Sequence, residues 1–130
     1  MREFELADFR SEANNNEKVA IYFYADWSAE SRLMSGNAER AFDRAEEYFR
    51  ERSLAEPDKY RGGFSCGAMF IDDNKGLLMV LGVKAVPTVC LIDKAKVYER
   101  IEGYRSEKDL LKSLSDFIGL RLFFAEKRDI

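Results

Sequence analysis

An uninterrupted apolar run that ends in a polar turn constrains the fold of this chain more than any other stretch. Residues 19–25 read Val-Ala-Ile-Tyr-Phe-Tyr-Ala, and this mixture of β-branched and aromatic residues predicts a strand that is covered on both faces. From Ser28 to about Arg52 the apolar residues recur at spacings of three and four, which predicts a long amphipathic helix. A buried strand that leads directly into such a helix is typical of an α/β sheet.

Strand and helix patterns continue to alternate along the chain. Residues 64–71 form a second apolar run, and residues 75–81 predict a short helix that ends at Gly82, a residue suited to the left-handed conformation of helix ends. The lead-in at 4–12 carries apolar residues among charges and predicts a short helical or mixed segment. Strands separated by helices favour parallel pairing through right-handed crossovers.

The C-terminal half adds a hairpin and a last helix. Strand-like runs at 88–92 and 97–101 are separated by a short polar turn, which suits a β-hairpin. The segment Ser106-Glu107-Lys108-Asp109 predicts the start of a helix. The apolar face of this helix would consist of Leu110, Leu111, Leu114, Ile118 and Leu122. Phe123 and Phe124 either extend its packing or, in a purely structural interaction domain, form the contact surface.

Composition and charge exclude several classes of function. A net charge of -3 gives no reason to expect nucleic acid or an anionic membrane as partner, and no apolar run approaches the length of a membrane span. Without histidine the chain cannot form a Ser-His or Cys-His nucleophile pair, which excludes a serine hydrolase of that kind. With only Cys66 and Cys90, and no Cys-x-x-Cys spacing, we expect no metal site and no cofactor.

The length of 130 residues predicts a single domain, residues 1–130. No charged N-terminal region followed by an apolar stretch opens the chain. We therefore expect a cytoplasmic, soluble protein, or an exported one if a leader segment was removed.

Two segments of the chain resemble the thioredoxin family. They are Ala25-Asp26-Trp27-Ser28-x-x-Ser31-Arg32 and Gly82-Val83-x-x-Val86-Pro87-Thr88. With Gly103-Tyr104 after the last strand, the resemblance covers about residues 18–120. The sequence Tyr-Ala-Asp-Trp at residues 24–27 is similar to that of domains of the disulfide-interchange type. The resemblance implies a thioredoxin-like α/β fold, in which a central mixed β-sheet is flanked by helices on both faces.

The resemblance also implies a site. In this family the turn after the central strand presents Cys-x-x-Cys at a helix N-terminus, and here Ser28 and Ser31 occupy the two cysteine positions. An extended substrate peptide would dock beside this turn, pairing with the backbone next to a cis proline. The residues that the resemblance assigns to substrate binding are Trp27, Val86, Pro87 and Thr88.

The two serines change what the turn can do. Thiol-disulfide exchange needs a thiolate, and a helix N-terminus lowers the pKa of a cysteine from about 8.5 to roughly 3.5–7.5. A serine hydroxyl neither ionises there nor forms a disulfide, so we expect no redox activity at Ser28 and Ser31. Taken alone, Ser28 is read as a helix N-cap. Tyr22 occupies the strand position at which many family members bury an aspartate, which puts the family's proton relay in doubt.

The two remaining cysteines are expected to be inert. Cys66 and Cys90 fall in predicted strands on opposite sides of the central strand, too far apart for a disulfide. Cysteines in such strands are most often buried, reduced thiols.

Two interpretations of function remain open. The preferred one is a thiol-disulfide oxidoreductase whose active cysteine pair was replaced by serine through engineering. Its substrate would be a protein or peptide with a disulfide or thiol in an extended conformation, and a reductase would be a further partner. The alternative is a natural redox-inactive thioredoxin-like module that binds a peptide or partner protein through the groove beside Pro87. Both predict a monomer, and the source-gene codons for residues 28 and 31 would separate them.

Overall fold

The computed structural model of the protein describes residues 1–119. Its helices and strands lie close to the predicted segments, and the chain alternates between the two as expected. In chain order the elements are β1 (Arg2–Glu3), α1 (Leu6–Asn15), β2 (Lys18–Tyr24), α2 (Ala29–Ala55), β3 (Phe64–Phe70), the 3-10 turn η1 (Ile71–Asp73), α3 (Lys75–Leu81), β4 (Thr88–Asp93), β5 (Lys96–Glu102) and α4 (Glu107–Ile118).

The strands form one mixed sheet in the order β1-β3-β2-β4-β5, which places the long apolar run, β2, at its centre. β2 pairs in parallel with β3 and antiparallel with β4. β4 and β5 form the predicted antiparallel hairpin, with Lys94 and Ala95 of its turn at positive φ. The turn between them is short enough to join adjacent antiparallel strands directly.

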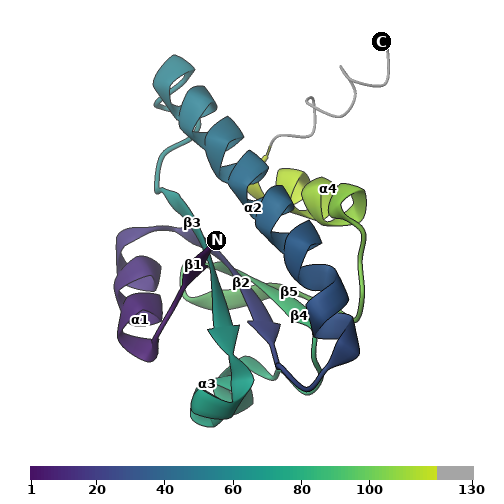
Figure 1. The fold of residues 1–130 in the computed structure, drawn as a ribbon. Coiled ribbons are helices and arrows are strands. Elements are labelled where there is room, and N and C mark those ends of the chain that lie inside the picture. Colours follow the sequence, from purple (N-terminus) through teal and green to yellow (C-terminus); the bar gives the residue numbers. More distant parts are fainter. Residues whose placement is uncertain (120–130) are drawn as a thin grey trace.

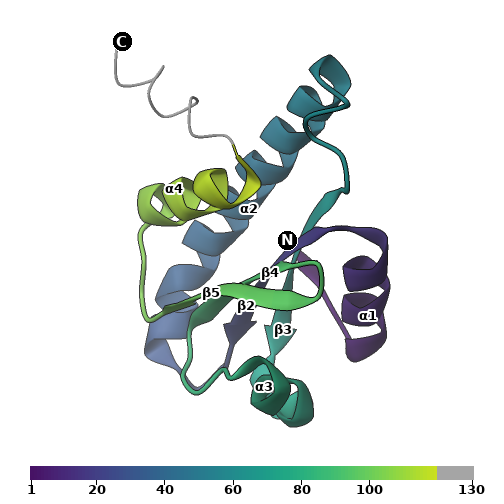
Figure 2. The same cartoon turned by 180° about the vertical axis from the view of Figure 1, so that it is seen from behind.

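Helices cover both faces of the sheet (Figure 1 and Figure 2). Alternate residues of β2 point to opposite faces, so that Ala20 and Tyr22 pack with α2 and α4, and Val19, Ile21 and Phe23 pack with α1 and α3. This arrangement confirms the thioredoxin-like α/β fold that the sequence predicts. It also explains why β2 is apolar throughout rather than alternating, because neither face of it meets water.

The first element differs from the prediction. The lead-in at 4–12 contains helix α1, as one of the expected outcomes, but it is preceded by the two-residue strand β1, which pairs in parallel with β3. Phe4, which follows β1, covers Gly67 so closely that a Cβ there would lie 2.6 Å from the Phe4 ring. A strand of two exposed residues has no hydrophobic period, so only its pairing with β3 identifies it.

Part of the predicted C-terminal packing falls beyond the structure. Ser106 caps α4 as expected, with its side chain accepting a hydrogen bond from the Asp109 N–H, and Leu110, Leu111, Leu114 and Ile118 are buried. The described residues do not include Leu122, Phe123 or Phe124, nor residue 120, at which the resemblance was expected to end. Of the helices in residues 1–119, none combines the length and the hydropathy that a membrane crossing requires.

Candidate functional site

The turn between β2 and α2 is built as a helix N-cap. The Ser28 hydroxyl accepts a hydrogen bond from the Ser31 N–H at 3.1 Å, and the Ser28 N–H donates to the Ala25 carbonyl at 3.2 Å. This confirms the interpretation of Ser28 as the N-cap of α2. It satisfies one of the donors that every helix leaves free in its first turn.

The two serines of the turn are not equivalent. Ser28 is half-buried and its side chain reaches the surface, whereas Ser31 is only 2% exposed. The Ser31 hydroxyl accepts a hydrogen bond from the Ala25 N–H at 3.3 Å. An outer hydroxyl at the helix N-terminus and an inner one beneath it are therefore held by backbone amides.

Tyr22 lies beneath this turn. Its hydroxyl donates a hydrogen bond to the Ser31 carbonyl at 2.5 Å, and its side chain is 1% exposed. Burial raises the pKa of Tyr22 to about 12, with the hydrogen bond to Ser31 partly opposing the shift. The position that the resemblance associates with a buried carboxylate thus holds a neutral hydroxyl, which anchors the first turn of α2 and cannot accept a proton near neutral pH.

A second loop, residues 83–87, approaches the turn from the other side of the site. The Val86–Pro87 peptide bond is cis, in agreement with the expectation. The Pro87 carbonyl accepts a hydrogen bond from the Gly103 N–H at 2.8 Å, and the Thr88 hydroxyl donates to the Ala85 carbonyl at 2.7 Å. Pro87 and Thr88 are buried, and neither is among the residues that line the cavity described below.

The segment that follows β5 ties this loop to α2. Asn37 of α2 donates hydrogen bonds from its side-chain nitrogen to the Tyr104 hydroxyl and to the Arg105 carbonyl, both at 3.1 Å. Gly103 in turn holds Pro87. The segment Gly103-Tyr104 therefore joins the helix of the first motif to the proline of the second motif.

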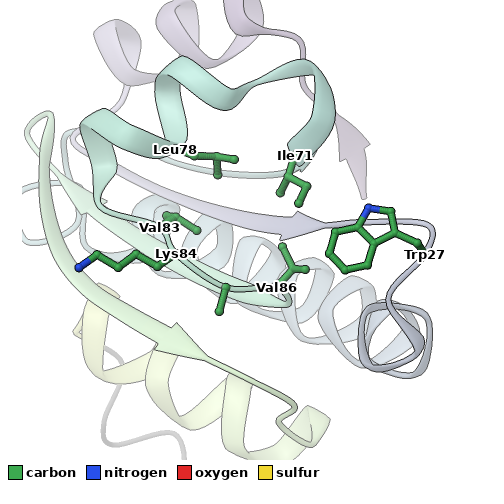
Figure 3. Close-up of a pocket in the computed structure, with 7 residues that line it drawn as sticks. Trp27, Ile71, Leu78, Val83, Lys84 and Val86 are labelled. Atoms are coloured by element: carbon green, nitrogen blue, oxygen red, sulfur yellow. The ribbon is translucent and has the colours of Figure 1, made fainter.

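A small apolar cavity lies between Trp27 and this loop (Figure 3). Its volume is about 140 Å³. Trp27 is 66% exposed, which leaves one face of its ring available at the rim. The residues that line the cavity are Trp27, Ile71, Leu78, Val83, Lys84, Ala85 and Val86.

The backbone of Val86 is available beside the cavity. Among residues 1–119, neither its N–H nor its carbonyl makes a hydrogen bond with another backbone or side-chain group. An unpaired N–H and carbonyl at a loop surface can pair with one residue of an extended peptide. Trp27 and Val86 thus come together as the sequence expects.

The opposite wall of the cavity was not part of the predicted site. It is formed by Ile71 of η1, Leu78 of α3 and Val83 after it, and Figure 3 shows these side chains converging on the space beside Val86. Ile71 and Leu78 are only half-buried although they follow the apolar patterns of β3 and α3. That pattern predicts burial, but it does not say against which partner.

The cysteines lie away from the turn. Cys66 pairs with Ala20 across β3 and β2, and Cys90 pairs with Ile21 across β4 and β2, so they flank the central strand as predicted and belong to the cores of opposite faces. Both are buried and free. Burial raises the pKa of Cys66 well above its usual value, with Glu46 and Asp43 adding to the shift, and raises that of Cys90 to about 11. These thiols stay protonated and inaccessible at neutral pH.

No group of three or more Asp, Glu, Cys or His side chains suited to a metal ion occurs within the described residues 1–119.

Comparison with known proteins gives a consistent result. The sequence model of the family described as Thioredoxin matches residues 1–116. The zinc-bound form of human ERp44 superimposes with a TM-score of 0.71 at 20% identity, over 89% of this chain and 31% of ERp44. A mutant thioredoxin from Halobacterium salinarum superimposes with a TM-score of 0.65 at 20% identity, over 91% of this chain and 89% of that protein.

The oxidised form of mitochondrial thioredoxin 3 from Saccharomyces cerevisiae superimposes with a TM-score of 0.61 at 21% identity, over 89% of this chain and 94% of that protein. The chain thus spans less than a third of ERp44 and most of each thioredoxin. At these identities the likeness is one of fold. The comparison with curated proteins found no match.

Proposed function

This chain belongs to the thioredoxin family, and we propose that it is a member that binds an extended segment of a peptide or partner protein in the groove between Trp27 and Val86, without thiol-disulfide exchange at its Ser28–Ser31 turn. The observation that carries the proposal is the position of an apolar cavity beside the Val86 N–H and carbonyl, which form no hydrogen bond within residues 1–119. A peptide strand placed there would gain backbone hydrogen bonds and a pocket for one side chain.

The chemistry of the turn supports the absence of exchange. Exchange begins when a thiolate attacks one sulfur of a disulfide and displaces the other as a thiolate. Ser28 and Ser31 offer hydroxyls only, and both hydroxyls accept hydrogen bonds from backbone N–H groups. Cys66 and Cys90 are buried on opposite faces of the sheet and cannot replace them.

A second candidate function is the silenced form of an oxidoreductase, in which serine stands where the active protein has cysteine. The geometry that favours it is the position of the two hydroxyls, with the half-buried Ser28 capping the N-terminus of α2 and Ser31 buried one turn further. A thiol at position 28 would be stabilised as a thiolate by the helix N-terminus. It would form a mixed disulfide with the substrate, and a thiol at position 31 would then displace the reduced substrate and leave a 28–31 disulfide.

In that second candidate, the partner is a protein or peptide that carries a disulfide or thiol in an extended conformation. Two electrons would pass from the dithiol to the substrate disulfide in each turnover. A reductase would then return the 28–31 disulfide to the dithiol. The groove would have the same role in both candidates, because it positions the extended segment beside the turn.

One experiment tests the absence of exchange in the first candidate and the exchange chemistry of the second. The protein as it stands, the double variant Ser28→Cys/Ser31→Cys and the control Ser106→Cys are each added to a disulfide-bonded peptide with dithiothreitol as the reductant. Ser106 caps α4 through a hydrogen bond from the Asp109 N–H at 3.1 Å, so the control places a thiol at a second helix N-terminus, one that does not border the groove of Trp27 and Val86. We expect acceleration by the double variant only.

Acceleration by the unchanged protein would contradict the proposed lack of exchange. A double variant that folds normally but remains inactive would count against the oxidoreductase candidate. Equal acceleration by the Ser106→Cys control would mean that a capped thiol is sufficient and that the groove contributes nothing.

A further inference from the structure

We propose that the groove selects peptides in which an acidic side chain neighbours the apolar side chain that enters the cavity, with Lys84 and Arg100 attracting the acidic group. This inference rests on the proposed binding function and adds a substrate class to it. It follows from the size of the cavity and from the charges at its two ends.

The cavity accommodates one side chain. Its volume of about 140 Å³ is well below the roughly 300–1,000 Å³ of sites for drug-sized ligands. A cavity of about 150 Å³ lined by aliphatic and aromatic side chains holds a benzene molecule. The lining of this one is aliphatic and aromatic apart from Lys84. Its occupant is therefore a single leucine-sized or phenyl group presented by a backbone that continues in both directions.

Lys84 is the one charged residue in that lining. It is exposed, and among residues 1–119 it forms no ion pair. In Figure 3 its side chain extends from beside Val83 toward the end of the groove opposite Trp27. A peptide that passes Val86 toward this end would bring its next side chains near the Lys84 ammonium.

Arg100 of β5 adds a second positive charge at the same end. Its Nε donates a hydrogen bond to the Leu81 carbonyl at 2.7 Å, and a Cβ on Gly82 would lie 2.9 Å from one of its terminal nitrogens. The guanidinium is thus next to the segment that leads into Val83 and Lys84. It too has no carboxylate partner within the described part of the chain.

The ion pairs of residues 1–119 lie away from the cavity, and their positive charges are balanced by carboxylates of the protein itself. Examples are Lys18 with Asp93 and Arg40 with Glu107. The Trp27 end of the groove carries both signs, because the exposed Arg32 donates a hydrogen bond to the Asp26 carbonyl next to Trp27. Asp26 precedes Trp27, and the exposed Asp72 follows Ile71 of the cavity wall. Positive charges without an ion-pair partner among residues 1–119 therefore gather at the Lys84 end, and an acidic peptide residue is attracted there.

The test uses the intrinsic fluorescence of Trp27, the single tryptophan of the chain, which lies at the rim of the cavity. Short peptides of glycine and serine with blocked ends carry one leucine and, beside it, either Glu, Gln or Lys. We expect the Glu peptide to bind about threefold to fivefold more tightly than the Gln peptide, as for an exposed ion pair, and the Lys peptide to bind most weakly. The preference should shrink at high salt.

Charge reversal supplies the decisive variant. Lys84→Glu should abolish the preference for the Glu peptide and strengthen binding of the Lys peptide relative to the unchanged protein, since Arg100 then balances the new carboxylate at that end. The matched control is Lys96→Glu, which makes the same change in net charge at the exposed first residue of β5, at the other end of the hairpin. The control should keep the preference for Glu.

The outcomes separate this inference from the function beneath it. Equal affinity for the three peptides, with a Trp27 response to each, overturns the acidic preference and leaves the groove as a binding site. No Trp27 response to any leucine peptide, in the unchanged protein or in Lys84→Glu, overturns the proposed binding function and this inference with it.

Discussion

Two helix starts in this protein use the same local chemistry in different surroundings. Ser28 accepts a hydrogen bond from the Ser31 N–H, and Ser106 accepts one from the Asp109 N–H, both at 3.1 Å. Around the start of α4 the further contacts are polar and lie at the surface, such as the ion pair between Glu107 and Arg40. The start of α2 has a buried tyrosine beneath it, a tryptophan beside it and the Pro87 loop next to it. The serine cap is the same at both helix starts. The contacts around Ser28 are what make the start of α2 a candidate site.

The largest expected difference between the two starts comes from the support beneath α2. Tyr22→Ala removes a buried ring and the hydrogen bond to the Ser31 carbonyl, so we expect unfolding by urea to show a loss of about 3–5 kcal/mol. A loss below about 1 kcal/mol would contradict the view that Tyr22 anchors the turn, since a hydrogen bond alone is worth that much. If the variant does not fold, Tyr22→Phe tests the hydrogen bond by itself, with an expected loss of about 1 kcal/mol.

The next difference concerns binding instead of stability. Trp27 is 66% exposed and borders the cavity, so Trp27→Ala should leave the free energy of unfolding nearly unchanged and weaken peptide binding by about 2 kcal/mol. Because this variant lacks the fluorescent group, calorimetry is the suitable measurement. Tyr98→Ala, which also removes an exposed aromatic side chain but lies on β5, is the control and should bind normally. Unchanged affinity of Trp27→Ala would remove the tryptophan from the site.

Alkaline pH should distinguish the α2 start from the α4 start by the titration of Tyr22. Its pKa is about 12 in the folded protein, because of burial, and near 10 in an unfolded chain. The folded state therefore keeps a proton that the unfolded state loses. Stability is fully present below pH 10, falls as the pH rises toward 12 by about 3 kcal/mol, and then levels off.

The measurement for this effect is the difference between the pH curves of the protein and of Tyr22→Phe. Tyr24 also contributes to the absolute curves, because burial and the Glu3 carboxylate raise its pKa. Parallel curves between pH 10 and 12 would show that Tyr22 is not the group responsible.

The smallest effect tests the equivalence of the caps themselves. Ser28→Ala and Ser106→Ala each remove one hydrogen bond to a first-turn N–H, and each should cost about 1 kcal/mol in thermal or urea unfolding. If the two losses differ by more than about 1 kcal/mol, the surroundings of α2 change the energy of the Ser28 cap. The two caps would then not be equivalent.

The sequence predicted the elements better than it predicted their partners. β2, α2, the hairpin and α4 follow from hydrophobic period, turn residues and a serine cap, all of which depend on neighbours within a few positions. β1 escaped prediction because two exposed residues carry no period, and its only evidence is its pairing with β3. The groove was predicted in part. The resemblance assigned Trp27 and Val86 to it, whereas Ile71 and Leu78 were identified as lining residues only in the structure.

By itself, the sequence determined that a buried strand would lead into a long capped helix and that no thiol would stand at that turn. These properties are local, since side-chain chemistry and the 2.0 and 3.6 residue periods operate along the chain. Only the tertiary structure decided that Ser31 is buried while Ser28 is half-buried, and that Tyr22 reaches the Ser31 carbonyl. It also placed Lys84 at the groove without an ion-pair partner among residues 1–119. Each of these depends on segments far apart in sequence that meet when the sheet and its helices pack, because solvent exposure and pairing belong to the folded surface and not to the residue.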